Sequence, residues 1–374
     1  MHIGVPKEIK NHEYRVALVP SAVRELVQKG HQLSVQSSAG AAVGLSDLDY
    51  QSAGAEIVDN AEEIFNSADM IVKVKEPQAS ERKMLREGQV LFTYLHLAAD
   101  LPQTRDLLDS GATCIAYETV TDNQSRLPLL APMSEVAGRM SIQAGAHCLE
   151  KSQAGAGILL AGVPGVEPGR VVIIGGGVVG SNAARIAVGM GAEVIVLDRS
   201  LQVLRSIDQE FGTKVRTVYS NTDNLYAYVS NADMVIGGVL IPGAAAPKLV
   251  SRDMIRAMRP GSVVVDVAID QGGCFETSHA TTHADPTFIV DDVVHYCVAN
   301  MPGAVPRTST FALTNATFPY VMSLADKGAY KAMLENPHLL NGLNIVKGNV
   351  TCETVANNLN FNYVESKTAL QQYN

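Results

Sequence analysis

Short apolar runs alternate with amphipathic segments along most of the chain. In the first third, residues 2–5, 32–36, 70–75, 90–95 and 113–116 form apolar runs of strand length. Segments with helical spacing of apolar residues lie between them, among them 21–29 and 101–109. Runs of the first kind predict strands and segments of the second kind predict helices. We expect Ser21 to cap the helix at 21–29 and Gly30 to follow its end.

The remaining residues repeat this rhythm after a Leu-Pro-Leu-Leu-Ala-Pro crossover at 127–132. A long helix is predicted at 135–151, followed by a glycine-rich connector at 154–169. Strands are predicted near residues 171, 193, 215, 233, 262 and 294, and helices at 310–327 and 331–340. Alternating strands and helices favour parallel sheets covered by helices, so we expect an α/β fold with two domains.

The expected domains are an α/β domain that begins at residues 1–130 and a doubly wound Rossmann domain at 131–305. Residues 306–374 are expected to return to the first domain, because so short a segment would bury little core by itself. We expect a cleft to separate the two domains.

A glycine motif follows the β-branched run at 171–174. Gly175, Gly177 and Gly180 have the spacing G-x-G-x-x-G, a helical segment follows, and the next β-branched run ends at Asp198. Glycines so placed allow a tight turn, close approach of backbone N–H groups to a pyrophosphate, and close packing of helix on strand. The acid at the end of the second strand suits the ribose of a dinucleotide. The alternative is an ordinary glycine-rich loop.

Four polar residues follow or end predicted strands. Arg15 follows the first strand, Lys75 ends 70–75, His96 follows 90–95 and Asp270 ends an apolar run at 262–270. In open α/β sheets, ligands bind beyond the carboxyl ends of the strands. Two such domains facing one cleft would bring two cations, an imidazole and a carboxylate to a nicotinamide. This set suits a small carboxylate-bearing substrate that gains or loses a hydride.

Each of these residues also has a simpler interpretation. Arg15 could pair with Glu13 on the surface, and Lys75 could be a solvated strand end. His96 could be a core histidine whose hydrogen bonds are satisfied. Asp270 could be a turn residue before two glycines. The joint occurrence of the four residues favours a site.

Composition narrows the classes of protein. The chain has 374 residues, of which 47% are hydrophobic and 18% charged, and a net charge of -9 without a run of Lys or Arg. Nucleic acid and anionic membranes are therefore not expected partners. The five cysteines are scattered and form no metal-ligand pattern, as in a reducing cytosol. The chain lacks the pattern of a signal peptide and has no long apolar run, so we expect a cytoplasmic protein.

Several segments resemble L-alanine dehydrogenase. They lie at 3–16, 72–77, 92–98, 175–180, 264–274 and 300–306, and the resemblance extends over essentially the whole chain. Some of these segments are shared with the NAD-binding subunit of proton-translocating transhydrogenase. The specific part is the joint presence of Arg15, Lys75, His96 and Asp270.

The resemblance implies reversible, NAD-dependent oxidative deamination of L-alanine to pyruvate and ammonia by a homohexamer. It implies that Arg15 and Lys75 bind the substrate carboxylate and carbonyl, that His96 is the general acid and base, and that Asp270 orients substrate and water. The residues that it implies for binding NAD are Ser134, Gly175, Gly177, Val178, Val179, Gly180, Asp198, Ser220, Val239, Leu240, Val267, Ala268, Ile269, Asp270, Val298, Ala299, Asn300 and Met301.

Some positions depart from the family pattern. Ala299 stands where the family often has proline, and Arg199 could help to hold the 2′-phosphate of NADP. We expect NAD nevertheless, because the carboxylate of Asp198 would repel that phosphate. Some family members bind magnesium through a Glu and a His. Glu118 is present here, but the late helix offers Lys327, so no metal is predicted.

Two rival functions fit the same motifs. One is a transhydrogenase-type module that exchanges hydride with another nucleotide-binding domain, and the other is a protein that senses NAD without catalysis. Within the same chemistry, serine, glycine or glyoxylate are alternative substrates.

Overall fold

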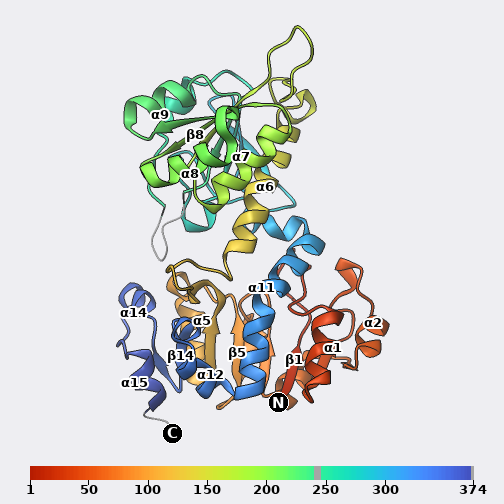
Figure 1. Ribbon diagram of the computed structural model, residues 1–374. Coiled ribbons are helices and arrows are strands. Elements are labelled where there is room, and N and C mark those ends of the chain that lie inside the picture. The colour runs from red at the N-terminus through yellow and green to blue at the C-terminus, as the bar shows by residue number, and fades with distance from the viewer. Residues whose placement is uncertain (240–245, 372–374) are drawn as a thin grey trace. The chain divides into compact units, whose positions relative to one another are not determined.

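The computed structural model describes residues 1–239 and 246–371. The chain divides into two compact units, one made of Met1–Met133 with Val305–Asn374 and the other of Ser134–Ala304. Each unit holds one sheet with helices packed on it, as Figure 1 shows, so the expected α/β class with two domains is confirmed. Within the described ranges, no helix combines the length and apolar character that crossing a bilayer requires.

The first unit is built on a sheet with the strand order β15-β14-β6-β5-β4-β1-β2-β3. Its parallel strands are β1 (His2–Val5), β2 (Gln32–Gln36), β3 (Glu56–Val58), β4 (Met70–Val72), β5 (Val90–Thr93) and β6 (Thr113–Ala116). The late strand β14 (Leu343–Val346) pairs antiparallel with β6 and with β15 (Asn349–Val350). Residues after 305 therefore extend the first sheet.

Helices cover this sheet on both faces. They are α1 (Pro20–Gln28), α2 (Asp47–Ser52), α3 (Ala61–Ser67), α4 (Ala79–Arg82), α5 (Leu101–Ser110), α11 (Pro306–Lys327), α12 (Ala329–Glu335), α13 (Pro337–Leu340), α14 (Glu353–Leu359) and α15 (Ser366–Gln371). Because both faces are covered, every residue of β4 and β5 is buried, which explains their continuous apolar sequence.

The second unit is built on a sheet with the order β12-β13-β11-β10-β7-β8-β9. Its strands are β7 (Arg170–Ile174), β8 (Glu193–Asp198), β9 (Val215–Tyr219), β10 (Met234–Gly237), β11 (Val263–Asp266), β12 (Thr287–Val290) and β13 (Val293–Tyr296). The helices are α7 (Val178–Gly189), α8 (Leu201–Phe211), α9 (Thr222–Val229) and α10 (Arg252–Arg256), and α6 (Ala131–Cys148) leads into the unit. The edge strand β12 is antiparallel and was not expected from the sequence.

The parallel strands follow the same order in the two sheets. In the first, the parallel strands lie in the order β3-β2-β1-β4-β5-β6, and in the second in the order β9-β8-β7-β10-β11-β13. In both, the chain starts in the middle, fills one half of the sheet and then crosses to the other half. The order therefore reverses between β1 and β4 and again between β7 and β10, and these switch points are where open α/β sheets bind ligands.

Three predicted strands are too long. β4 ends at Val72, β5 at Thr93 and β11 at Asp266, whereas the apolar runs predict 70–75, 90–95 and 262–270. At β4 the reason is a side chain, because the N–H of Val74 donates to the carboxylate of Glu8 at 2.7 Å. The apolar run therefore continues beyond the strand, although the N–H of Tyr94 still donates to the Val74 carbonyl oxygen at 3.3 Å.

Two predicted helices also differ. The predicted cap Ser21 is wrong, because α1 begins at Pro20 and Val19 precedes it without a side-chain capping bond. Proline suits this first position because it has no N–H group to satisfy. The single helix expected at 331–340 is two helices, α12 and α13, which are separated at Asn336. The Asn336 side chain accepts the N–H of Leu339 at 3.2 Å and caps the second helix.

The close packing of α7 on β7 depends on Gly180. A Cβ at this position would lie 1.8 Å from the carbonyl oxygen of Gly175, whereas a Cβ at Gly189 of the same helix would have no atom within 4 Å. We expect Gly180→Ala to lower the free energy of unfolding by about 1–3 kcal/mol. Gly189→Ala is the matched control and should raise it by about 0.5–1 kcal/mol. Scanning calorimetry measures both, and equal changes in the two variants would contradict this account.

Candidate functional site

Three of the expected site residues emerge at one edge of the first sheet. Arg15 lies in the loop after β1, Lys75 lies just beyond β4, and His96 lies just beyond β5. The strands β1, β4 and β5 are neighbours and run parallel. Their carboxyl ends therefore share one edge, and β1 and β4 flank the switch point.

Arg15 is buried, with 2% of its surface exposed. Its Nε donates to Glu13 Oε1 at 2.7 Å, its Nη2 donates to Glu13 Oε2 at 2.6 Å, and its Nη1 lies 3.0 Å from the sulfur of Met133. Burial alone would lower the pKa of Arg15, but the hydrogen bond and charge of Glu13 outweigh it and raise the pKa. The pair with Glu13 therefore exists, but it is buried rather than on the surface, and the guanidinium remains charged.

Lys75 is half-buried, and its backbone is held from two sides. Thr93 Oγ1 donates to the Lys75 carbonyl oxygen at 3.0 Å, and the Lys75 N–H points to Glu8 Oε1 at 3.4 Å. Burial raises the pKa of the adjacent Glu76 carboxyl, but the charge of Lys75 and the hydrogen bond from Lys10 outweigh this and lower it. The backbone of Lys75 is therefore fixed, and its side chain is only partly exposed.

His96 is presented by a strained backbone. Its φ is 52°, in the left-handed region, and 46% of its side chain is exposed, so the interpretation as a core histidine is wrong. The ring stacks on Tyr94 with centroids 5.7 Å apart and an interplanar angle of 5°. Glu118, in the short 3-10 turn Tyr117–Thr119, accepts the His96 N–H at 2.6 Å, and its Oε1 lies 3.8 Å from Nδ1. Tyr94 and Glu118 therefore hold both the backbone and the ring.

The edge of the first sheet thus gathers two cations and an imidazole. Tyr94 supports the imidazole, because its ring stacks on the ring of His96. The Tyr94 hydroxyl donates to the Leu129 carbonyl oxygen at 2.5 Å, which fixes the ring. Fixed cations beside a titratable ring are suited to a small anion that exchanges protons during reaction.

The second unit presents an open helix terminus after β7. Gly175 has a φ of 94°, which favours glycine, and Gly177 precedes α7 without a side-chain capping bond. A Cβ on Gly177 would have no atom within 4 Å, so the first turn of α7 is accessible from this side. Backbone N–H groups of a helix N-terminus bind phosphate groups in this geometry. The residues present therefore fit the pyrophosphate of a dinucleotide.

Asp198 closes this loop from the end of β8. Its Oδ2 accepts the N–H of Gly176 at 2.8 Å, and its Oδ1 accepts the N–H of Ser200 at 2.7 Å. The carboxylate is thus fixed beside the glycine loop, where a dinucleotide places a ribose.

Most other residues expected to bind the cofactor follow carboxyl ends in this sheet. Ser220 follows β9, Val239 follows β10, residues 267–270 follow β11, and residues 298–301 follow β13. Ser134 lies in α6, and Leu240 lies outside the described residues. These strands are parallel members of one sheet, so their loops lie at one edge together with the glycine loop.

Asp270 is exposed in the 3-10 turn Ile269–Gln271, which ends at Gly272. It therefore lies in a turn, as one interpretation expected, rather than at the end of a strand. Asp266 anchors this turn, since its carboxylate accepts the N–H groups of Ala268 at 3.2 Å and Cys274 at 3.0 Å. Burial raises the pKa of Asp266 despite these bonds.

Several residues that hold this machinery were missed by sequence reasoning. They are Glu8, Tyr94 and Asp266; Glu13 was considered only as a surface partner of Arg15, and Glu118 only as a metal ligand. Asp266 carried a signal, because an acid inside an apolar run implies a buried carboxylate with specific partners. The other residues had none, since no local pattern tells which acid faces which base.

Comparison with protein families assigns both parts of the chain. The family model described as "Alanine dehydrogenase/PNT, N-terminal domain" matches residues 4–137. The model described as "Alanine dehydrogenase/PNT, C-terminal domain" matches residues 141–353.

Individual relatives agree with the family models. The chain is 60% identical to an alanine dehydrogenase of Halomonas elongata over 99% of this chain and 100% of the relative. It is 55% identical to an alanine dehydrogenase of Bacillus subtilis over 99% of this chain and 98% of the relative.

Solved structures extend the comparison. A structure titled L-alanine dehydrogenase matches with a TM-score of 0.93 and 50% identity, covering 96% of this chain and 99% of its own. A transhydrogenase from Sinorhizobium meliloti matches with a TM-score of 0.81 at 22% identity over 94% of this chain and 99% of its own, and shows a shared fold. With family models over nearly its whole length and relatives this similar, the chain belongs to the alanine dehydrogenase/PNT family.

Proposed function

We propose that this chain catalyses the reversible, NAD-dependent oxidative deamination of L-alanine to pyruvate and ammonia. The observation that carries the proposal is the placement of Arg15, Lys75 and His96 after three adjacent parallel strands, in a chain whose second unit fits a dinucleotide. The high identity to alanine dehydrogenases over the whole chain supports the choice of substrate.

The second unit binds NAD. The N–H groups at the start of α7, reached through Gly175, Gly177 and Gly180, hold the pyrophosphate, and Asp198 accepts hydrogen bonds from the ribose. Bound NAD supplies a nicotinamide ring that accepts a hydride from the substrate Cα. The further residues that we assign to the cofactor are Ser134, Val178, Val179, Ser220, Val239, Leu240, Val267, Ala268, Ile269, Asp270, Val298, Ala299, Asn300 and Met301.

Arg15 and Lys75 bind the carboxylate and the carbonyl of the substrate. Arg15 is charged and held by Glu13, so its guanidinium is ordered before the substrate arrives, and the backbone that carries Lys75 is fixed as well. In the direction of pyruvate reduction, Lys75 polarises the carbonyl. Charge-assisted bonds of this kind orient the Cα for hydride transfer.

His96 moves the protons. After hydride loss the substrate is an iminium ion, and His96 takes a proton from the water that attacks it. It then returns a proton to the nitrogen as the carbinolamine collapses to pyruvate and ammonia. Overall, zwitterionic L-alanine, oxidised NAD and water give pyruvate, ammonium, NADH and one proton. Positioned acid–base catalysis typically contributes about 100- to 10,000-fold, and Asp270 orients substrate and water in this scheme.

The test of the function is a direct assay. NAD and L-alanine at alkaline pH should form NADH, and His96→Ala should lower kcat by about 100- to 10,000-fold while leaving the Kd for NADH unchanged. His147→Ala is the matched control, since His147 is an exposed histidine that pairs with Glu150, and it should retain activity. Turnover of His96→Ala within a few-fold of the wild type would refute its role. Tight NADH binding without any turnover by the wild type would favour a sensor.

The charge of Asp198 should exclude NADP. We expect Asp198→Asn to raise kcat/KM with NADP relative to NAD, because the variant keeps an acceptor for the Gly176 N–H but loses the charge that repels a 2′-phosphate. Steady-state kinetics with both nucleotides measure the ratio. An unchanged ratio would remove Asp198 from the ribose site.

We also propose a cytoplasmic homo-oligomer, a hexamer by resemblance to the family. The low charged fraction of 18% supports extensive contact between subunits. Light scattering on the eluting protein should give six times the mass of one chain, and a monomer would contradict the proposal.

A further inference from the structure

Glu8 lies in the loop after β1 and is 7% exposed. Its Oε1 accepts the N–H of Val74 at 2.7 Å and faces the N–H of Lys75 at 3.4 Å, and its Oε2 accepts from Lys73 Nζ at 3.1 Å. Each of these partners is a donor, so the arrangement requires both oxygens to act as acceptors. That is the behaviour of an ionised carboxylate.

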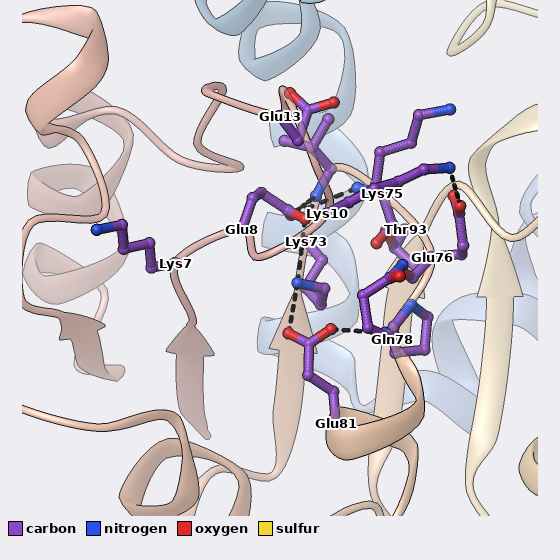
Figure 2. A network of polar contacts seen from close by, with 12 residues as sticks. Lys7, Glu8, Lys10, Glu13, Lys73, Lys75, Glu76, Gln78, Glu81 and Thr93 are labelled. Atoms are coloured by element: carbon purple, nitrogen blue, oxygen red, sulfur yellow. Dashed lines mark hydrogen bonds and ion pairs between the residues drawn. The ribbon is translucent and has the colours of Figure 1, made fainter. Parts of the chain in front are cut away.

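Lys73 is fully buried between two acids. Its Nζ lies 3.1 Å from Glu8 Oε2 and 2.8 Å from Glu81 Oε1, and none of its surface is exposed. In Figure 2 the Lys73 side chain runs toward Glu81, whereas the Lys75 side chain points away from Glu81. Burial would lower the pKa of Lys73, but the two carboxylates outweigh it and raise the pKa, so the ammonium stays charged.

Glu8 and Glu81 both pair with Lys73, but each has a different second partner. Glu81 Oε2 accepts the N–H of Gln78 at 2.7 Å, which caps the short helix α4. Glu8 instead holds the backbone next to Lys75, where β4 has ended and β1 no longer provides a neighbouring strand. Glu8 thus replaces the missing strand on that side, while Glu81 serves the helix.

Glu8 also interacts electrostatically with Arg15, the other cation proposed to bind the substrate. Its charge contributes to the raised pKa of Arg15, and Glu13, the partner of Arg15, in turn contributes to the raised pKa of Glu8, for which burial is the largest cause. One buried carboxylate therefore interacts with the charges of Lys73 and Arg15 and with the backbone of Lys75.

We propose that Glu8 is a positioning residue for the reaction, which fixes the backbone at Val74 and Lys75 so that Lys75 presents its ammonium to the substrate, with Lys73 as its buried counter-ion. The inference rests on the proposed function of Lys75. It assigns Lys73, the neighbouring lysine in the same segment, to the support of Lys75 and not to the substrate.

The pair Glu8→Gln and Glu81→Gln tests the proposal in the full-length protein. Each variant removes one of the two carboxylates beside Lys73, so the loss of charge is matched. A glutamine at position 8 has one acceptor oxygen, and its amide would place donors against Lys73 or against the Val74 N–H. We expect Glu8→Gln to raise the KM for L-alanine by about 10- to 100-fold, because small misplacements of a binding group cost that much. The Kd for NADH should stay unchanged.

Glu81→Gln should lower the unfolding temperature as Glu8→Gln does but leave the KM for L-alanine within about threefold of the wild type. Glu8→Asp keeps the carboxylate and should recover part of the lost KM. An equal rise of KM in the two Gln variants, or no rise in Glu8→Gln, would overturn the proposal, because either result makes the network purely structural.

Should Glu8→Gln fail to fold, the same comparison applies to Glu8→Asp and Glu81→Asp. A higher KM for L-alanine in Glu8→Asp alone supports positioning, and equal KM values overturn it. Wild-type protein that forms no NADH from L-alanine would refute the proposed function. If the wild type is active but the Glu8 and Glu81 variants have the same KM for L-alanine, only this inference is refuted.

Discussion

The two sheets have the same strand order, and the positions of all candidate site residues depend on it. A parallel strand followed by a helix must return to the same side before the next strand begins, so every loop after a strand emerges at one edge. In the first sheet this edge carries Arg15, Lys75 and His96, and in the second it carries the glycine loop and Asp198. Strand order thus brings residues that lie far apart in the chain to one edge of their sheet.

Cations at such an edge need buried anions to hold them. Arg15 is clamped by Glu13, and Lys73 lies between Glu8 and Glu81. A buried ion pair contributes little net stability, because the desolvation of both charges offsets most of their attraction, whereas removal of one partner is costly. These acids are therefore better explained by what they hold in place than by what they add to stability.

The sequence predicts most of the fold because the strands are covered on both faces and their apolar runs are nearly continuous. It does not predict where they end. β4 stops at Val72 because Glu8, distant in the chain, takes the N–H of Val74. The late strands β14 and β15 are not predicted; Asn344 interrupts the apolar run of β14, and β15 has only two residues, too few for a periodic pattern.

The sequence predicts the candidate site only in part, as it does the strand ends. The strand-end rule singles out Lys75, but it applies equally to Lys73, two positions earlier in Lys-Val-Lys. In an extended strand both side chains would point to one face, and both would be candidates for the substrate. Because the backbone has left the strand at Val72, one lysine is buried against Glu8 and Glu81 and the other is half-buried beside Glu76. What separates the two lysines is therefore a contact with the loop after β1, which no local reading of the segment contains.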